Sequence, residues 1–265
     1  MKALLLLFAL LACTPANATE RILALSPHAC EILHAIGADD GVVGISEYCD
    51  YPASFKNKPV IADYSRVFVE SALRLKPTMV VAPHAALKGL SQIKKHGVQI
   101  VITHPASLHD IFEDTERIGR LTGHAAQAHH LVQSLKQRLK KIQANIGSRK
   151  RAFFEVWGDP LMTEAGRSFI TEVLSAAGAD NVFAARNVET MRLNVEAVLR
   201  AKPEMIIIPS KSGRIDGRIA FWKQWLPDVP VIAVNPDMVS RPGPRIIDGI
   251  EALQRQLQRQ QDRTP

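Results

Sequence analysis

The sequence lacks the short motifs that mark the common enzyme classes. It contains no Gly-x-Ser-x-Gly elbow, no phosphate-binding loop and no closely spaced nucleophile and base. Aromatic side chains are scarce, with 3 Trp, 3 Tyr and 9 Phe among 265 residues. After residues 3–12, no apolar run approaches the roughly 20 residues that a membrane-spanning helix needs. We therefore expect a protein that is not an enzyme and whose later segments do not cross a bilayer.

The basic residues do not form the pattern of a nucleic-acid-binding protein. Lys and Arg number 33 against 26 Asp and Glu, which gives a formal net charge of +7. They are scattered along the chain or lie on the polar faces of expected helices, without a stacking platform or a glycine-rich loop. We therefore expect no nucleic-acid partner.

The N-terminus has the features of a secretory signal peptide at residues 1–18. Lys2 supplies the positive charge, residues 3–12 form a short apolar core, and Ala16-Asn17-Ala18 is a small-x-small cleavage site. These features predict export to the periplasm. The sequence Leu-Leu-Ala-Cys at residues 10–13 also resembles a lipobox, so a lipoprotein anchored to the membrane through Cys13 is the alternative.

Two further cysteines, Cys30 and Cys49, form the disulfide candidate. An even number of cysteines in an oxidising compartment is typical of disulfide pairing, and two remain if Cys13 is removed with the signal peptide. Each follows an expected early strand, so the bond would join neighbouring strand ends. The alternative is a pair of small, partly buried thiols.

An internal repeat is the most informative feature of the chain. Residues 69–84 return as residues 195–210, identical at half of their positions and apolar for apolar at most others. Each copy predicts a short helix that ends at Lys-Pro, because proline cannot continue a helix. A run rich in Val and Ile follows, which suits a parallel strand buried on both faces. One αβ unit in each half of the chain predicts two similar lobes.

Strand and helix patterns alternate along both halves of the chain. This alternation predicts an α/β fold with two similar Rossmann-like lobes, each with a parallel sheet, joined by a single long backbone helix and enclosing a ligand cleft. We expect an N-terminal lobe at residues 19–122, the linking helix at 123–147 and a C-terminal lobe at 148–265. The expected strands are 21–25, 42–46, 79–82, 100–103, 152–156, 205–208 and 231–234, and the expected helices include 107–121, 124–145 and a closing helix from about residue 244.

The candidate ligand-binding residues follow expected strands. Ligands of open parallel sheets bind at the loops beyond the carboxyl ends of the strands. Aromatic faces in such loops suit a bulky planar ligand, and a neighbouring Asp and Arg suit its polar groups. The loop candidates are Pro27, His28, Tyr48, His84, Trp157, Asp237 and Arg241.

Three histidines leave a metal site open as an alternative. His28, His84 and His104 each follow a different expected strand of the N-terminal lobe, so they could converge at the cleft. Three imidazoles can hold Zn²⁺ or another divalent metal. Our first expectation is that no metal is held and that these side chains form hydrogen bonds in loops.

Over nearly its whole expected mature length, the chain resembles the cobalamin-binding members of the helical-backbone class of periplasmic binding proteins, which serve ABC importers. Other members of this class take up haem and siderophores. The resemblance is carried by Leu25-Ser26-Pro27, Gly44-Ile45-Ser46-Glu47-Tyr48-Cys49-Asp50-Tyr51-Pro52, residues 70–77, Pro230-Val231-Ile232, and Asp237 and Arg241 followed by Pro244-Arg245-Ile246-Ile247.

The resemblance implies a role for particular residues of the cleft. Tyr48, Tyr64 and Trp157 would line the space for a corrin ring, with Asp237 and Arg241 near its polar periphery. The chain also departs from the pattern. Two positions where the resemblance implies tryptophan hold Pro83 and Thr190, and a disulfide expected in the C-terminal lobe has no cysteines here.

The resemblance further implies that Glu70 and Glu196 dock on arginines of a two-fold symmetric permease. They occupy equivalent places in the repeat, so two like carboxylates could meet two like subunits. The simpler explanation is that a Glu in the first turn of a helix interacts favourably with the helix dipole, which contributes about 0.3–1 kcal/mol.

These observations together predict a monomeric substrate-binding protein that captures cobalamin or a related corrinoid in the periplasm. Its partners would be the ligand and an ABC permease dimer with its cytoplasmic ATPase, and it would need no catalytic cofactor. The alternatives are a haem, siderophore or metal-ion binding protein of the same class.

Overall fold

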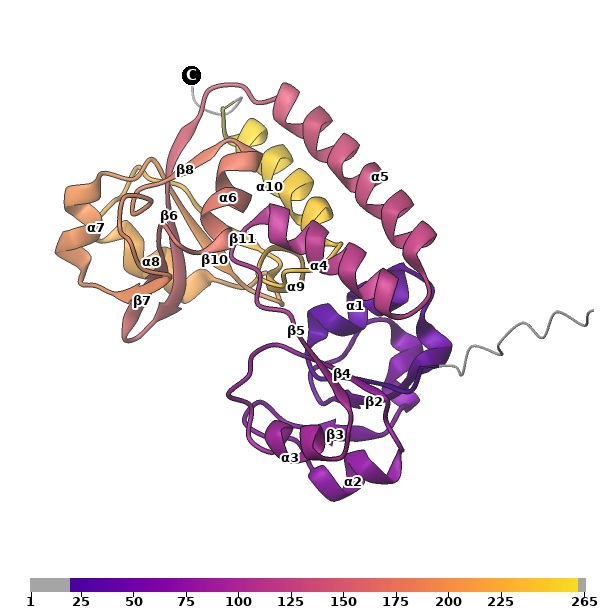
Figure 1. The fold of residues 1–265 in the computed structure, drawn as a ribbon. Coiled ribbons are helices and arrows are strands. Elements are labelled where there is room, and N and C mark those ends of the chain that lie inside the picture. The colour runs from indigo at the N-terminus through magenta and orange to yellow at the C-terminus, as the bar shows by residue number, and fades with distance from the viewer. Residues whose placement is uncertain (1–19, 262–265) are drawn as a thin grey trace, which may run out of the picture.

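The computed structural model describes residues 20–261, which form two α/β lobes joined by helices (Figure 1). The predicted signal peptide and Cys13 lie outside the described residues. Within residues 20–261, no helix is both long enough and apolar enough to cross a membrane.

The N-terminal lobe is built on a five-stranded parallel sheet in the order β3-β2-β1-β4-β5. Its inner strands are buried because their sequences are apolar on both faces. β2 and β4 coincide with expected strands, whereas the three-residue strand β3 was not predicted. The strands are β1 (Ile22–Ala24), β2 (Val42–Ser46), β3 (Val60–Ala62), β4 (Met79–Ala82) and β5 (Gln99–Ile102), and the helices are α1 (Pro27–Ala35), α2 (Val69–Arg74) and α3 (Leu90–Lys95), with 3₁₀ turns at Asp39–Gly41 and Ala53–Asn57.

The C-terminal lobe has a six-stranded sheet whose parallel part repeats the first lobe. β11, β10 and β6 are parallel, as expected, and the short strand β8, which was not predicted, is parallel to β6. Beyond β6, β7 pairs with β6 and β9 pairs with β7, both in antiparallel geometry, and these two strands were not predicted from the sequence. The strands are β6 (Lys150–Gly158), β7 (Leu161–Glu164), β8 (Ala179–Asn181), β9 (Thr190–Arg192), β10 (Met205–Pro209) and β11 (Val231–Val234), and the helices are α6 (Phe169–Ala177), α7 (Val195–Ala201), α8 (Asp216–Lys223), α9 (Pro236–Val239) and α10 (Ile246–Gln261).

The sequence repeat is also a structural repeat. Lys76 and Lys202, which follow α2 and α7, both adopt the left-handed conformation with φ of 47°, which is uncommon for residues other than glycine. An arginine at the start of a neighbouring strand caps the carboxyl end of each helix. Arg21 donates to Leu75 O at 2.7 Å, and Arg151 donates to Ala201 O at 2.5 Å. The two αβ units therefore end in the same way, through the same kinds of side chain.

Two helices connect the lobes and pack on both of them. The amino-terminal half of α4 (Leu108–Leu121) packs in the core of the C-terminal lobe, whereas Ile118 in its last turns belongs to the core of the N-terminal lobe. Along α5 (Ala125–Ala144), Ala128 lies in the core of the N-terminal lobe and Leu135 in the core of the C-terminal lobe. Because shared cores resist bending, the lobes are held on a stiff helical layer (Figure 1). The domain limits inferred from the sequence stay a prediction.

The structure contains the candidate disulfide between Cys30 and Cys49, with a Cα–Cα distance of 6.1 Å. Cys30 lies on α1, and Cys49 lies in the loop that follows β2. Both side chains are buried in the core of the N-terminal lobe. The bond therefore fixes the loop after β2 to the start of α1.

Removal of this disulfide should lower the stability of the protein. For Cys30→Ala/Cys49→Ala, we expect the free energy of unfolding in urea to fall by roughly 3 kcal/mol, because a cross-link over a loop of this length restricts the unfolded chain. Addition of a thiol reductant should destabilise the wild type by a similar amount and leave the variant unchanged. A loss below about 1 kcal/mol would contradict this structural role.

Candidate functional site

A cavity of about 370 Å³ lies at the carboxyl ends of the N-terminal lobe strands, facing the C-terminal lobe. Its floor is apolar, and two tyrosines and two histidines stand around it. Arg241 is the lining residue that comes from the C-terminal lobe. The residues that line the cavity are Leu25, Ser26, Pro27, His28, Ser46, Tyr48, Asp63, Tyr64, Pro83, His84, Leu87 and Arg241.

The two tyrosines are exposed side chains on loops that are fixed by local bonds. Tyr48 precedes the disulfide-bonded Cys49, so the disulfide restrains its loop. Asp63 Oδ1 accepts hydrogen bonds from Ser65 N at 2.7 Å and from Arg66 N at 2.9 Å, which closes a turn around Tyr64. Tyr64 is 82% exposed although it lines the cavity. Such preset aromatic faces are suited to contact with a planar apolar ligand.

His28 is a buried wall of the cavity and not a free ligand. Its Nε2 lies 2.8 Å from Thr103 Oγ1 and 3.3 Å from Ser26 Oγ. Burial lowers the pKa of His28 to about 4, so the imidazole is neutral near pH 7. His84 lines the same cavity and is exposed. Of the two, His84 is the imidazole that a bound molecule can reach.

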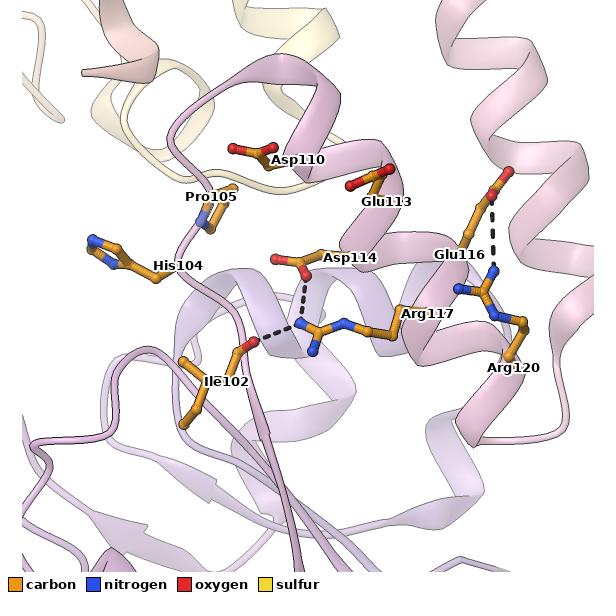
Figure 2. A pocket seen from close by; sticks show the side chains of 9 residues that line it. All are labelled: Ile102, His104, Pro105, Asp110, Glu113, Asp114, Glu116, Arg117 and Arg120. Carbon is orange, nitrogen blue, oxygen red and sulfur yellow. Dashed lines mark hydrogen bonds and ion pairs between the residues drawn. The ribbon is translucent and has the colours of Figure 1, made fainter. Parts of the chain in front are cut away.

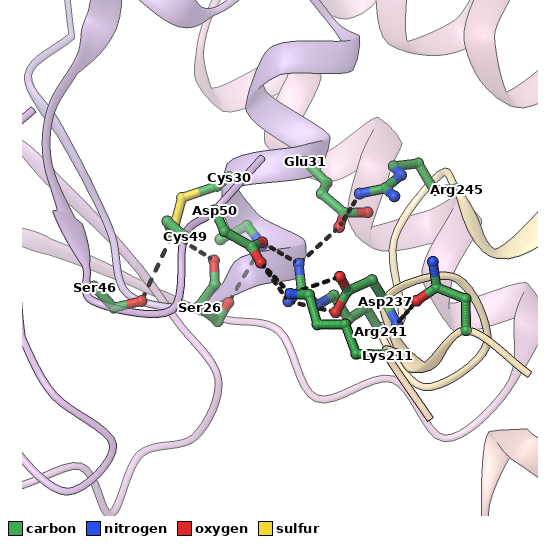
Figure 3. Close-up of polar contacts among 12 residues, drawn as sticks. Ser26, Cys30, Glu31, Ser46, Cys49, Asp50, Lys211, Asp237, Arg241 and Arg245 are labelled. Atoms are coloured by element: carbon green, nitrogen blue, oxygen red, sulfur yellow. Dashed lines mark hydrogen bonds and ion pairs between the residues drawn. A yellow bond between two sulfur atoms is a disulfide. The ribbon is translucent and has the colours of Figure 1, made fainter. Parts of the chain in front are cut away.

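Six charged side chains meet beside this cavity, where the two lobes touch (Figure 3). Arg241 is the centre of this ion cluster: it contacts Asp50 at 2.6 Å, Asp237 at 2.8 Å and Glu31 at 3.6 Å. Lys211 contacts Asp50 at 2.7 Å and Asp237 at 2.9 Å. Arg245 contacts Glu31 at 3.2 Å and lies over the ring of Tyr51.

Two carboxylates of the ion cluster, Asp50 and Glu31, have pKa values shifted in opposite directions. The hydrogen bond from Arg241 holds the pKa of Asp50 well below its usual range. Burial raises the pKa of Glu31 to about 7, although Arg245 and Arg241 both act to lower it. Glu31 is 1% exposed, and its Oε2 accepts no hydrogen bond within the described part of the chain. Desolvation therefore outweighs the two arginines at Glu31, whereas Asp50, which is about one-third exposed, stays ionised.

Other predicted residues lie outside the cavity. Asp237 is next to it through its contact with Arg241. Trp157, near the end of β6, is 61% exposed and donates from Nε1 to Asp159 O at 2.7 Å, but it does not line the cavity. We predicted that His104 could join His28 and His84, yet it lines a different hollow. Among residues 20–261, no group of three or more His, Cys, Asp or Glu side chains could hold a metal ion.

The second hollow, of about 580 Å³, runs along α4 (Figure 2). Its lining is mostly charged, and several of these charges are already paired, as Arg117 with Asp114 at 2.5 Å and Arg120 with Glu116 at 3.9 Å. No aromatic side chain other than His104 lines it. It therefore offers little to a planar apolar ligand, and the smaller cavity at the strand ends is the candidate site.

Glu70 and Glu196 occupy equivalent exposed positions in the first turns of α2 and α7. Asn194 caps α7 by accepting a hydrogen bond from Ala197 N at 3.0 Å, whereas Phe68 provides no side-chain cap to α2. The repeat therefore places an exposed glutamate at the same position of an equivalent helix in each lobe.

Neither Lys211 nor the pairing of Glu31 with two arginines was predicted from the sequence. Lys211 lies two residues after the end of strand β10, and the carboxyl end of a parallel strand was the available signal. Glu31 shares the short helix α1 with His28 and His34, so the sequence pattern did not distinguish a buried position for it from an exposed one.

Three comparisons relate the chain to known proteins. Residues 22–224 match the family model described as periplasmic binding protein. A vitamin B12-binding protein of Yersinia pseudotuberculosis serotype O:1b (strain IP 31758) is 32% identical over 259 residues, which covers 96% of this chain and 92% of the relative. The crystal structure of the periplasmic vitamin B12 binding protein BtuF of Vibrio cholerae is similar with a TM-score of 0.76 and 28% identity, and covers 91% of this chain and 98% of that one. The periplasmic heme-binding protein RhuT from Roseiflexus sp. RS-1, in apo form, has a TM-score of 0.78 and 25% identity, and covers 89% of this chain and 97% of that one.

The raised pKa of Glu31 predicts a pH dependence of stability. The folded protein binds this proton more tightly than the unfolded chain, so the contribution is complete below about pH 4.5 and is lost as the pH rises through about 7. Between pH 5 and pH 8, the free energy of unfolding of the wild type should fall relative to that of Glu31→Gln by on the order of 2–3 kcal/mol. Parallel profiles from urea unfolding of the two proteins would contradict this assignment.

Proposed function

Because the chain belongs to the periplasmic binding protein family, we propose that it captures cobalamin or a closely related corrinoid and delivers it to an ABC permease. As a member of this family it is a substrate carrier of the periplasm and not an enzyme. The ligand would bind between the lobes, in the cavity lined by Tyr48, Tyr64 and Arg241.

The observation that carries this proposal is the composition of the cavity wall. Tyr48 and Tyr64 provide large exposed aromatic faces beside an apolar floor, and Arg241 provides hydrogen-bond donors at the edge. A corrin is a bulky, nearly planar ring with a periphery of amide groups, so it needs both features. Pro27 and His84 complete the N-terminal wall, whereas Trp157 and Asp237 would reach the ligand from the C-terminal lobe.

Haem is the second candidate ligand. The likeness to a periplasmic heme-binding protein and the exposed His84 in the cavity both favour it. A corrinoid has the stronger support, because the vitamin B12-binding relative is more similar in sequence and nearly matches the chain end to end.

We further propose that Glu70 and Glu196 dock the protein on its permease. Both carboxylates are exposed on equivalent helices of the two lobes, which suits a permease dimer with two equivalent basic sites. The cytoplasmic ATPase of the importer would complete the assembly. The protein would act as a monomer that is released from its signal peptide after Ala18, since each copy already carries both carboxylates.

Calorimetric titration with cyanocobalamin, with haemin and Zn²⁺ in parallel, tests the ligand. We expect saturable one-to-one binding of cyanocobalamin to the wild type. Tyr48→Ala should weaken this binding about 10- to 100-fold, since the burial of one aromatic ring contributes about 1.5–3 kcal/mol.

Trp225→Ala is the matched control, because Trp225 is an exposed aromatic residue that lines neither hollow. It should leave the affinity unchanged. Full retention of binding by Tyr48→Ala would exclude this cavity, and binding of haemin alone would replace the corrinoid with haem.

Charge reversal tests the docking surface. Glu70→Lys/Glu196→Lys should abolish corrinoid uptake into vesicles that contain the permease and its ATPase, while the calorimetric affinity for cyanocobalamin stays unchanged. Glu113→Lys, which reverses an exposed carboxylate on α4, should transport normally. Uptake at the wild-type rate by the double variant would refute the docking role.

A further inference from the structure

Lys211 joins carboxylates of both lobes. It lies in the loop after β10 of the C-terminal lobe, and its Nζ contacts Asp50 Oδ2 of the N-terminal lobe at 2.7 Å. The same Nζ contacts Asp237 Oδ2 of its own lobe at 2.9 Å. Its side chain is 63% exposed, so it closes the outer side of the ion cluster (Figure 3).

The neighbours of Lys211 make its ion pairs contribute more to stability than an ordinary surface ion pair does. An isolated exposed ion pair contributes about 0–1 kcal/mol, because water solvates both partners well. Asp237 and Arg241 are mostly buried here, and Asp50 is about one-third exposed. Without Lys211, Asp50 and Asp237 would share Arg241, which also contacts Glu31. Both hydrogen bonds of Lys211 raise its pKa, so its charge persists at the pH of any assay near neutrality.

Lys211 also adds a second attachment point between the lobes. Within the described residues, the other ion pairs that Glu31 and Asp50 form with the C-terminal lobe come from Arg241 and Arg245, which follow α9. The helices α4 and α5 already hold the lobes together, but ion pairs from this one segment would leave the loop that carries Asp50 free to tilt about it. Lys211 approaches the same Asp50 from a different loop, so the two contacts together fix an orientation as well as a distance.

Asp50 is close to the cavity along the chain. It lies two residues after Tyr48, and its backbone N donates to Tyr48 O at 3.0 Å. Tyr48 and Asp50 therefore flank the disulfide-bonded Cys49 in one short loop, and the contacts of Asp50 restrain the part of this loop that Cys49 alone does not fix.

We propose that Lys211 is a positioning residue: it holds the Tyr48–Asp50 loop against the C-terminal lobe and so slows the escape of the ligand from the cleft. The positioning role concerns the ligand-free protein, and only the effect on escape rests on the proposed function.

Hydrogen exchange of the ligand-free protein tests the positioning role. In Lys211→Met, the amides of residues 47–50 should exchange about 3- to 10-fold faster than in the wild type, because the loop opens more often. Lys211→Arg keeps the charge and the donors, so it should restore slow exchange. Lys140→Met removes an exposed lysine of α5 and should have no effect. Unchanged exchange in Lys211→Met would overturn the proposal.

The dissociation rate of cyanocobalamin tests the proposed effect of Lys211 on the escape of the ligand. It is followed by stopped flow after dilution into excess ligand-free protein of the Lys140→Met form. We expect about 5-fold faster dissociation from Lys211→Met than from the wild type, with a weaker dependence on salt concentration. Lys211→Arg should restore both the rate and its salt dependence. Faster exchange with unchanged dissociation would refute the effect on escape. If the wild type does not bind cyanocobalamin, the proposed function fails, while the exchange result still decides the positioning role.

Discussion

The contact of Arg241 with carboxylates from both lobes is the constraint on which the site depends. Three acidic groups lie around one guanidinium, and one of them, Glu31, is buried. Burial already raises the pKa of Glu31, so separation of the lobes here would remove the two arginines that act to lower it and would leave Asp50 without Arg241. The ion cluster and the shared cores of α4 and α5 therefore hold the two sides of the cavity at a defined distance.

The same arrangement separates the roles of the two lobes. The N-terminal lobe supplies the apolar and aromatic wall, whose loops are fixed by the Cys30–Cys49 disulfide and by the turn at Asp63. The C-terminal lobe supplies the charged edge through Arg241. A ligand with a planar ring and polar substituents matches both surfaces, and this match is the physical basis of the proposed corrinoid specificity.

The sequence was sufficient where local pattern decides structure. β2, β4 and β11 coincide with expected strands because their apolar runs suit a strand that is buried in a parallel sheet. The repeat predicted the two lobes. It was insufficient where distant residues meet. Lys211 and Asp50 are 161 residues apart, and no periodicity pairs them. β9 was missed because its three residues are mostly exposed, and His104 was misplaced because its loop turns toward α4 and not toward the cavity.

A crystal structure of the protein with cyanocobalamin tests the central claim most directly. The corrin should lie between the lobes, in contact with Tyr48 and Tyr64, with its periphery near Arg241 and the Arg241–Asp50 pair intact. A corrin bound elsewhere, for example in the hollow along α4, or a complex in which Arg241 has left Asp50, would contradict the account.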